Sequence, residues 1–401
     1  MEKTKHPAHY NDIDLLPRAE QELRLRRLRR LMAGASAEAL LVHDSANIYY
    51  LTGRVFCGFI YIESAPDSAP LYFVRRPCHL AGPGREMIRK PEDIPAVLFV
   101  EEGSLSYTLA TRIRHAFEGC GLSEGIADGS GILRACRAVK TEYEQAKLRE
   151  SGVRQTEVYS RIPSLYREGM SDIELQIEIE RESRLAGCLG QFRISGDDME
   201  LYMGNVLTGA NADTPSPYDF AMGGAGLDPS LPVGADGTVI RPGIPVMVDV
   251  NGNYTGYMTD MTRCYVVPDE AAPLPGVVDR AHRLSVDICH ELARMGRPGT
   301  KASDLYMRAL GMAEAAGMID YFMGHRSHAG FVGHGCGIEI NELPVISPRS
   351  RDVLEAGNVI AIEPKFVLPG IGAVGIENTY LVTPEGMKAL TSAPEEIIHL
   401  R

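Results

Sequence analysis

The sequence lacks several features that would place the chain outside the cytoplasm or define its chemistry at once. It has no apolar run of about 18 residues or more, the length that spans a bilayer, and its opening residues, MEKTKHPAHY, have no apolar stretch typical of a signal peptide. Its eight cysteines form no CxxC pair, and a chain of 401 residues needs no disulfides to complete its core. We therefore expect reduced thiols, a cytoplasmic location and no membrane contact. No GxSxG motif is present, so nucleophilic serine chemistry has no support.

The sequence also has fewer basic than acidic residues. The chain has 41 Lys and Arg residues against 53 Asp and Glu residues, which gives a formal net charge of −12. Binding to a nucleic acid needs a basic face that displaces counterions, so we expect no nucleic-acid partner. The acidic excess can belong to an ordinary solvated surface, or part of it can form an inward cluster of carboxylates.

The apolar pattern predicts an α/β (α+β) chain in two domains, residues 1–137 and 138–401. In the first domain it predicts helices and strand-length runs at 17–34, 39–42, 70–74, 96–100 and 104–119. In the second it predicts helices at 140–167, 171–185, 275–295 and 302–317, strands at 239–250 and 254–267, and a β-hairpin across 358–383. The stretch 208–237 is dense in Gly, Pro, Asp and Ser and is expected to be a long loop.

Two aspartates lie in segments that are otherwise typical of a buried strand pair. Asp249 follows the apolar run 246–248, although aspartate is disfavoured in strands. Asp260 lies on the far side of the glycine-bounded stretch 252–256. If the turn is centred in that stretch, the two carboxylates face each other across the ladder, about 5 Å apart. Like charges that close are unfavourable unless a cation lies between them.

A second acidic pair repeats this pattern near the C-terminus. Glu363 and Glu377 each follow apolar strand residues and lie symmetrically about Gly370. A turn centred on this glycine places the two carboxylates opposite each other. Two acidic pairs on core-like strands favour an inward carboxylate cluster over four separate surface charges.

His334 supplies a candidate nitrogen ligand. It lies among Gly333, Gly335 and Gly337, which let the backbone approach other groups closely. A lone histidine is more often an ordinary core or surface residue, but this setting beside the acidic pairs favours a ligand. Four carboxylates and one imidazole suit two divalent ions, Mn, Co, Zn or Fe, with Mn preferred. Two such ions about 3.5–4 Å apart generate a hydroxide nucleophile at neutral pH.

At these residues the sequence resembles the pita-bread metallohydrolases, the family of methionine aminopeptidase, aminopeptidase P, prolidase and creatinase. The family's five ligand positions are matched in order and context by Asp249, Asp260, His334, Glu363 and Glu377. The segments GYMTDMTR at 256–263 and IEP at 362–364 are close to the motifs of this family. NIYYLTG at 47–53 and RAVKTEYE at 137–144 resemble the amino domain and the domain junction of the prolidase and creatinase branch. The resemblance implies a creatinase-like N-terminal domain followed by a pita-bread catalytic domain.

The resemblance also implies a role for each ligand. Asp249, Asp260 and Glu377 would hold one ion. Asp260 and Glu377 would bridge to a second ion, which His334 and Glu363 complete. Glu363 would also be catalytic, because it handles the proton of the bridging water. The implied reaction is hydrolysis of an amide bond, often the bond before proline, and the implied assembly is a homodimer.

Several positions depart from the peptidases of this family. Asn341 and Gly375 stand where those peptidases often carry a histidine and an arginine, and the stretch 208–220 lacks their usual histidine. We therefore take Asn341, Gly375 and Tyr218 as candidate substrate-binding positions, with Asp219 beside Tyr218 as a weaker one.

Two further histidines are candidate catalytic replacements. Gly330 stands where the family carries a histidine shortly before the ligand histidine, and His325 and His328 lie just upstream in GHRSHAGFVGH. Each of them is, taken singly, more typical of an ordinary surface histidine.

Three functions remain open from the sequence. The first is an Xaa-Pro aminopeptidase or dipeptidase with a peptide substrate, which the intact ligands and the amino domain favour. The second is a creatinase-like C–N hydrolase or lyase with a small non-peptide substrate, which the departures at Asn341 and Gly375 favour. The third is a catalytically inert pita-bread binding module, against which the retention of all five ligands argues.

Overall fold

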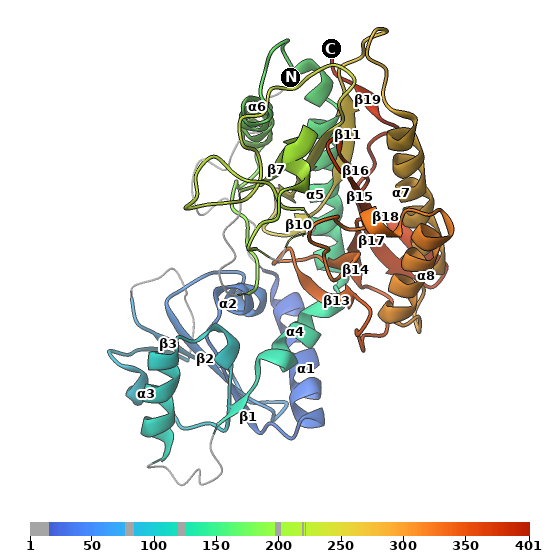
Figure 1. Cartoon of the computed structure of the whole chain (residues 1–401). Coiled ribbons are helices and arrows are strands. Elements are labelled where there is room, and N and C mark those ends of the chain that lie inside the picture. The colour runs from blue at the N-terminus through green and yellow to red at the C-terminus, as the bar shows by residue number, and fades with distance from the viewer. Residues whose placement is uncertain (1–15, 77–83, 119–125, 197–201, 219, 221) are drawn as a thin grey trace. The chain divides into compact units, whose positions relative to one another are not determined.

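The computed structural model describes residues 16–76, 84–118, 126–196, 202–218, 220 and 222–401. The chain forms two compact units that divide between Arg137 and Ala138 (Figure 1). Each unit mixes helices with strands, so the predicted α/β (α+β) fold class is confirmed. None of the described helices is both long enough and apolar enough to cross a membrane.

The first unit is built on a mixed sheet. Its described strands have the order β4-β3-β2-β1-β5-β6, with β1 antiparallel to β2 and parallel to β5. These strands are β1 (Ala39–Val42), β2 (Gly58–Glu63), β3 (Leu71–Val74), β4 (Arg85–Met87), β5 (Phe99–Val100) and β6 (Ala127–Asp128). The helices are α1 (Arg18–Gly34), α2 (Ser45–Thr52), α3 (Tyr107–Glu118) and α4 (Ser130–Ala138). The sequence pattern predicts α1, β1, β3 and α3, and its run at 96–100 contains β5. It does not predict β2, β4, β6, α2 or α4.

The second unit carries two larger sheets and two pairs of helices. One sheet has the order β19-β11-β8-β7 and the other the order β13-β12-β14-β17-β18. The first contains β7 (Gly204–Thr208), β8 (Val246–Val250), β11 (Thr262–Val266) and β19 (Ile398–His399). The second contains β12 (Gly333–Gly335), β13 (Glu342–Ile346), β14 (Val359–Ile362), β17 (Asn378–Thr383) and β18 (Gly386–Ala389). Two short pairs join β9 (Gly252–Asn253) to β10 (Met258–Thr259), and β15 (Lys365–Leu368) to β16 (Gly372–Gly375).

The helices of this unit begin close to their predicted positions. They are α5 (Glu142–Tyr159), α6 (Asp172–Leu185), α7 (Gly276–Met295) and α8 (Ala302–Ala315). Capping boxes begin α5 at Thr141 and α6 at Ser171, where the hydroxyl and a glutamate three residues later satisfy each other's backbone N–H groups. The α5 helix ends earlier than predicted, before Pro163, which lacks the N–H that a helix needs.

Each helix pair covers its own sheet with a separate apolar core. Ile288 of α7 and Leu305 of α8 belong to one core with Ile362 of β14, on the side where Figure 1 shows α7 and α8. Leu175 of α6 belongs to a second core with Val248 of β8. All five side chains are fully buried, and burial of one such side chain stabilises the fold by about 1.5–3 kcal/mol. The strands that end at the carboxylate cluster are thus anchored on both sides.

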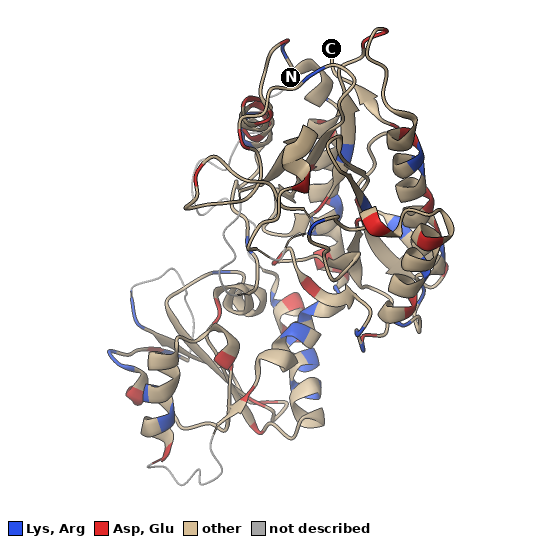
Figure 2. Ribbon diagram, viewed as in Figure 1, with Lys and Arg blue, Asp and Glu red and all other residues tan. Residues whose placement is uncertain are grey.

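Charged residues of both signs are spread over both units rather than gathered in one block (Figure 2). Most of the acidic excess is therefore ordinary surface charge, as the composition allows. The exceptions are the buried carboxylates, and Glu20 and Glu101 are the ones among the described residues of the first unit.

Glu101 is a buried carboxylate whose hydrogen-bond donors, in the described part of the chain, are neutral groups. It is 3% exposed, and it accepts hydrogen bonds at 2.8 Å from the backbone N–H groups of His43 and Asp44 and a further one from the Asn47 amide. Burial raises the pKa of Glu101 to about 7, although the three donors oppose that rise.

This raised pKa predicts how the stability of the fold depends on pH. The pKa is higher in the folded than in the unfolded chain, so the stability that protonated Glu101 contributes is full below about pH 4 and is lost as the pH rises through 7. Between pH 5 and 9 the wild type should lose up to roughly 3 kcal/mol of unfolding free energy relative to Glu101→Gln. Urea unfolding of both proteins across this range measures the difference. Glu38→Gln, at an exposed position of the same unit, should follow the wild type, and parallel curves for all three proteins would contradict the prediction.

Candidate metal centre

Asp249 and Asp260 are positioned by an antiparallel strand pair. Asp249 of β8 lies opposite Thr262 of β11, and the short β9–β10 pair closes a turn centred between Thr255 and Gly256. The prediction that Asp249 lies opposite Asp260 is therefore wrong, because the turn is centred one residue later than the glycine spacing indicates. Asp260 still precedes Thr262 by two residues, so the two aspartates are diagonal neighbours on one face of the ladder.

Glu363 and Glu377 lie in the register that the sequence predicts. Ile362 pairs with Asn378 on one side of them, and Lys365 pairs with Gly375 on the other. The same register continues through both pairs, so the two glutamates lie opposite each other, and this prediction is confirmed. The Glu377 backbone also exchanges hydrogen bonds with Thr262, whose hydroxyl donates to Glu377 Oε2 at 2.8 Å. This contact joins the two acidic strand pairs directly.

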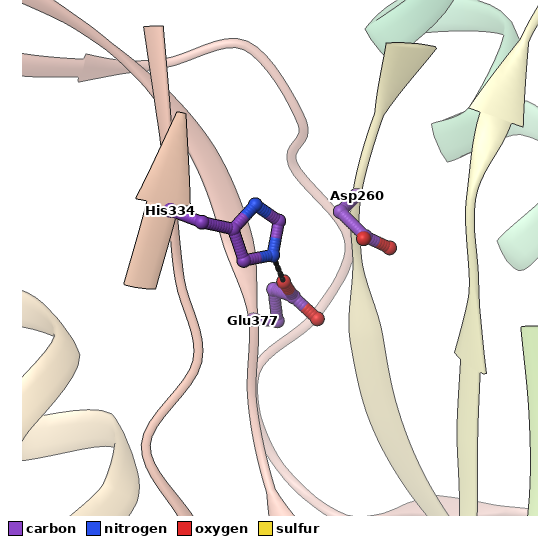
Figure 3. Close-up of side chains that lie close together, drawn as sticks. All are labelled: Asp260, His334 and Glu377. Atoms are coloured by element: carbon purple, nitrogen blue, oxygen red, sulfur yellow. Dashed lines mark ion pairs between the residues drawn. The ribbon is translucent and has the colours of Figure 1, made fainter. Parts of the chain in front are cut away.

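His334 enters the site from β12, which pairs with β14. A Cβ at its neighbour Gly333 would lie 2.5 Å from the carbonyl oxygen of Ala361, so the close strand approach requires glycine there. His334 Nε2 lies 3.3 Å from Glu363 Oε1 and 4.0 Å from Glu377 Oε1. Figure 3 shows the imidazole turned toward Glu377, with Asp260 on a separate segment of the chain, between β10 and β11. Nδ1 lies 3.2 Å from the carbonyl of Gly335, so a neutral ring that donates from Nδ1 presents its lone pair at Nε2.

The five residues predicted as ligands thus converge into two overlapping donor groups. Asp260, His334 and Glu377 form one, and Asp249, Glu363 and Glu377 form the other, with one donor atom of each member within 4.8 Å of the rest. Donors that share an ion at about 2.1 Å lie roughly 3–4 Å apart. Both groups therefore have the size of a metal site, and Glu377 belongs to each.

The charge on this cluster is poorly balanced on the His334 side. Burial, together with the nearby Asp249 carboxylate, raises the pKa of Asp260 to about 7. Burial and then Asp260 also raise the pKa of Glu377. Glu377 is 1% exposed, and its Oε1 has no hydrogen-bond partner among the described residues. An orphaned buried carboxylate oxygen facing an imidazole nitrogen fits a divalent cation at Asp260, His334 and Glu377.

On the Asp249 side the cluster holds a residue that the sequence analysis did not single out. Lys365 is fully buried, and its Nζ lies 2.8 Å from Asp249 Oδ2, 2.7 Å from Glu363 Oε2 and 3.4 Å from Glu377 Oε2. Burial would raise the pKa of Glu363, but Lys365 and His334 together lower it to about 2. A signal was present: a lone lysine in a buried strand, two residues after Glu363, lies on the same face as that glutamate.

Arg263 holds the two strand pairs together from behind the cluster. Its side chain is fully buried and donates to the carbonyl oxygens of Thr262 and Glu377 at 2.7 and 2.8 Å. It also donates at 2.7 Å to the Asn378 side chain and at 2.8 Å to the carbonyl of Ala393. The backbone on either side of Glu377 is therefore fixed by one guanidinium.

The candidate catalytic histidines and Tyr218 lie together in a pocket of the second unit. His325, His328 and Tyr218 line it, together with Asp213. His325 Nδ1 lies 3.1 Å from both carboxylate oxygens of Asp213, and His328 Nδ1 lies 2.9 Å from the carbonyl of Phe322. Neither histidine is a member of the two donor groups, and their catalytic role stays a prediction. Asp219 lies outside the described residues.

The other two candidate substrate positions have structural partners. The Asn341 amide donates to the Ser195 carbonyl at 2.6 Å and accepts from the Ser195 N–H at 2.8 Å. Gly375 faces Lys365 across the strand pair, and a Cβ at Gly375 would lie 2.9 Å from Lys365 Cγ. Asn341 therefore fixes the backbone at Ser195, and Gly375 leaves room for the lysine.

The comparison with protein families agrees with this geometry. The model of metallopeptidase family M24 matches residues 146–384, more than half of the chain, and that of the creatinase/prolidase N-terminal domain matches residues 24–82. The chain belongs to metallopeptidase family M24, which confirms the resemblance found in the sequence and the order of its domains.

Curated relatives match almost end to end. A putative dipeptidase, YkvY, of Bacillus subtilis is 27% identical over 407 aligned residues, which cover 94% of this chain and 99% of the relative. The Xaa-Pro dipeptidase of Pyrococcus furiosus is 26% identical and covers 94% of this chain and 99% of its own length.

Solved structures show the same fold. An Xaa-Pro dipeptidase from Bacillus anthracis matches with a TM-score of 0.75 and 21% identity, over 95% of this chain and all of the other. The prolidase from Pyrococcus horikoshii matches with a TM-score of 0.74 and 21% identity, over 94% and 100% of the two chains.

The contacts of Arg263 predict a large effect of a conservative change. Arg263→Lys removes the planar fork and leaves the carbonyl oxygens of Ala393 and Pro394 without their guanidinium donors, each at a cost of about 1–3 kcal/mol. We expect the free energy of unfolding to fall by about 3 kcal/mol or more, and metal affinity to fall with it because the Glu377 backbone is released.

Urea unfolding and isothermal titration with Mn²⁺ measure these two effects. Arg294→Lys is a matched control, because Arg294 pairs with Glu291 on exposed helix surface, where solvent screens the pair and its contribution to stability is small. Equal stability of the two variants would refute the positioning role of Arg263.

Proposed function

We propose that this chain is a metal-dependent Xaa-Pro peptidase, an aminopeptidase or dipeptidase that cleaves the bond before proline. The observation that carries the proposal is the convergence of Asp249, Asp260, His334, Glu363 and Glu377 into two overlapping donor groups. Membership of an M24 family whose end-to-end relatives include Xaa-Pro dipeptidases supports the substrate class.

The donor set supports a divalent metal, and we propose Mn²⁺ as the first ion to test because carboxylates dominate the set. Bound at Asp260, His334 and Glu377, such an ion supplies Lewis acidity toward a carbonyl and lowers the pKa of water. The Glu363 carboxylate, with its pKa held near 2, is ionised at neutral pH and can accept a proton during attack on the amide. Lys365 and His334 fix the position of that carboxylate.

Substrate selection is proposed for the pocket lined by His325, His328 and Tyr218. The Asp213 carboxylate fixes the His325 ring, so Nε2 of His325 remains as the outward polar atom. Asn341 cannot replace the missing histidine while its amide is bound to Ser195, and Gly375 offers no side chain.

These two departures favour one alternative. If the peptide-binding groups are not rebuilt in the pocket, the same centre can act as a creatinase-like hydrolase or lyase on a small C–N substrate. The homodimer implied by the resemblance stays a prediction, which sedimentation velocity tests.

Turnover of defined peptides tests the leading proposal. Mn²⁺-loaded protein should release proline from Ala-Pro or Met-Pro, and should cleave the matched Ala-Ala or Met-Ala peptides far more slowly. Glu363→Gln should lower kcat by about 10²–10⁴-fold, the range expected for loss of a general base.

Glu385→Gln, at an exposed position, is the control and should keep wild-type activity. Metal content is measured on each protein, so loss of the ion is separated from loss of the base. Metal-bound protein that releases no residue from any peptide of the panel would refute the proposal, and turnover of a small amidine or amide instead would establish the alternative.

A further inference from the structure

We propose that the Lys365 ammonium group takes the place of one cation in the carboxylate cluster, so that each chain binds a single divalent ion, at Asp260, His334 and Glu377. The inference deepens the proposed function, since it assumes that the cluster is a metal centre. It differs from the two-ion centre that the family resemblance implies.

The position of Lys365 Nζ carries the proposal. It lies within 2.8 Å of Asp249 and Glu363 and 3.4 Å from Glu377, the three carboxylates of one donor group. An ammonium has three N–H donors, and this group offers it three anionic acceptors. A metal ion among the same oxygens would lie at about 2.0–2.2 Å from each. It would then overlap Nζ, so the ion and the ammonium cannot both be present.

The lysine is held in this place by its strand. Lys365 is fully buried, and its backbone carbonyl accepts a hydrogen bond of 2.8 Å from the N–H of Met323. The strand partner Gly375 provides the space, because a side chain at that position would meet Lys365 Cγ and Cα at 2.9 Å. The space that the Lys365 side chain occupies therefore depends on the absence of a side chain at Gly375.

The two glutamates divide their oxygens between the lysine and the histidine. Oε2 of Glu363 and Oε2 of Glu377 face Lys365 Nζ. Oε1 of Glu363 and Oε1 of Glu377 face His334 Nε2, at 3.3 and 4.0 Å. The His334 side therefore keeps the Oε1 atoms of both glutamates, which do not face the ammonium, and Glu377 Oε1 has no hydrogen-bond partner among the described residues.

Net charge does not decide the number of ions. The four carboxylates of the cluster bring four negative charges, and Lys365 neutralises one. One divalent ion then leaves a net charge of −1, and two would leave +1. The number of ions therefore rests on the overlap between a second ion and Lys365 Nζ.

Metal stoichiometry tests the inference without reference to activity. Wild-type protein equilibrated with Mn²⁺ and desalted should contain one Mn per chain by mass spectrometry, and should give the six-line EPR signal of an isolated Mn²⁺. Lys365→Ala should contain two, with the broadened signal of a coupled pair. Lys388→Ala, at an exposed strand position, is the matched control and should bind one.

Each outcome decides the question. Two ions in the wild type, or none, would overturn the proposal, as would a folded Lys365→Ala that still binds one. If Lys365→Ala fails to fold by circular dichroism, Lys365→Met keeps the volume without the charge and is judged by the same count. One ion with no peptide turnover would refute the proposed peptidase while leaving this inference standing, and two ions with turnover would do the reverse.

Discussion

The structure depends on the compensation of buried negative charge. Four carboxylates lie within a few ångströms of one another, and Glu363 and Glu377 are almost inaccessible to water. Such a cluster is unstable without cations, because neither solvent nor distance screens its repulsion. The ammonium of Lys365 supplies part of the compensation from within the chain, and the orphaned Glu377 oxygen marks where the rest must come from. The fold itself therefore supplies one of the cations that the carboxylate cluster needs.

The rest of the catalytic unit keeps these charges in place. One acidic strand pair is anchored by the core under α5 and α6, and the other by the core under α7 and α8. The two meet at the Thr262–Glu377 backbone contact, and Arg263 binds carbonyl oxygens on both sides of it. Because the ligands lie on strands or within two residues of a strand end, small changes in either core are transmitted to the ligand positions.

How much of this the sequence reveals depends on the kind of constraint. The register of Glu363 and Glu377 follows from one tight turn at Gly370, and it is correct. The register of Asp249 fails, because several glycines and polar residues allow neighbouring turn centres and the short β9–β10 pair selects one. The four helices of the second unit start within two residues of their predicted positions, but the end of α5 is predicted eight residues too late. Contacts between side chains of different strands, such as those of Lys365, require the folded structure because no local pattern encodes them.

The departures from the family pattern are better understood as a rearrangement than as a loss. The peptidases often carry a cation at the position of Gly375, and this chain carries one directly across the strand pair, at Lys365. In this chain the cation opposite Gly375 lies inside the cluster, where its Nζ contacts Asp249 and Glu363. A fixed interior cation needs no metal supply and cannot be exchanged or chelated. In the proposed one-ion centre, a substrate would meet one replaceable ion beside Glu363, a carboxylate whose pKa Lys365 and His334 hold low.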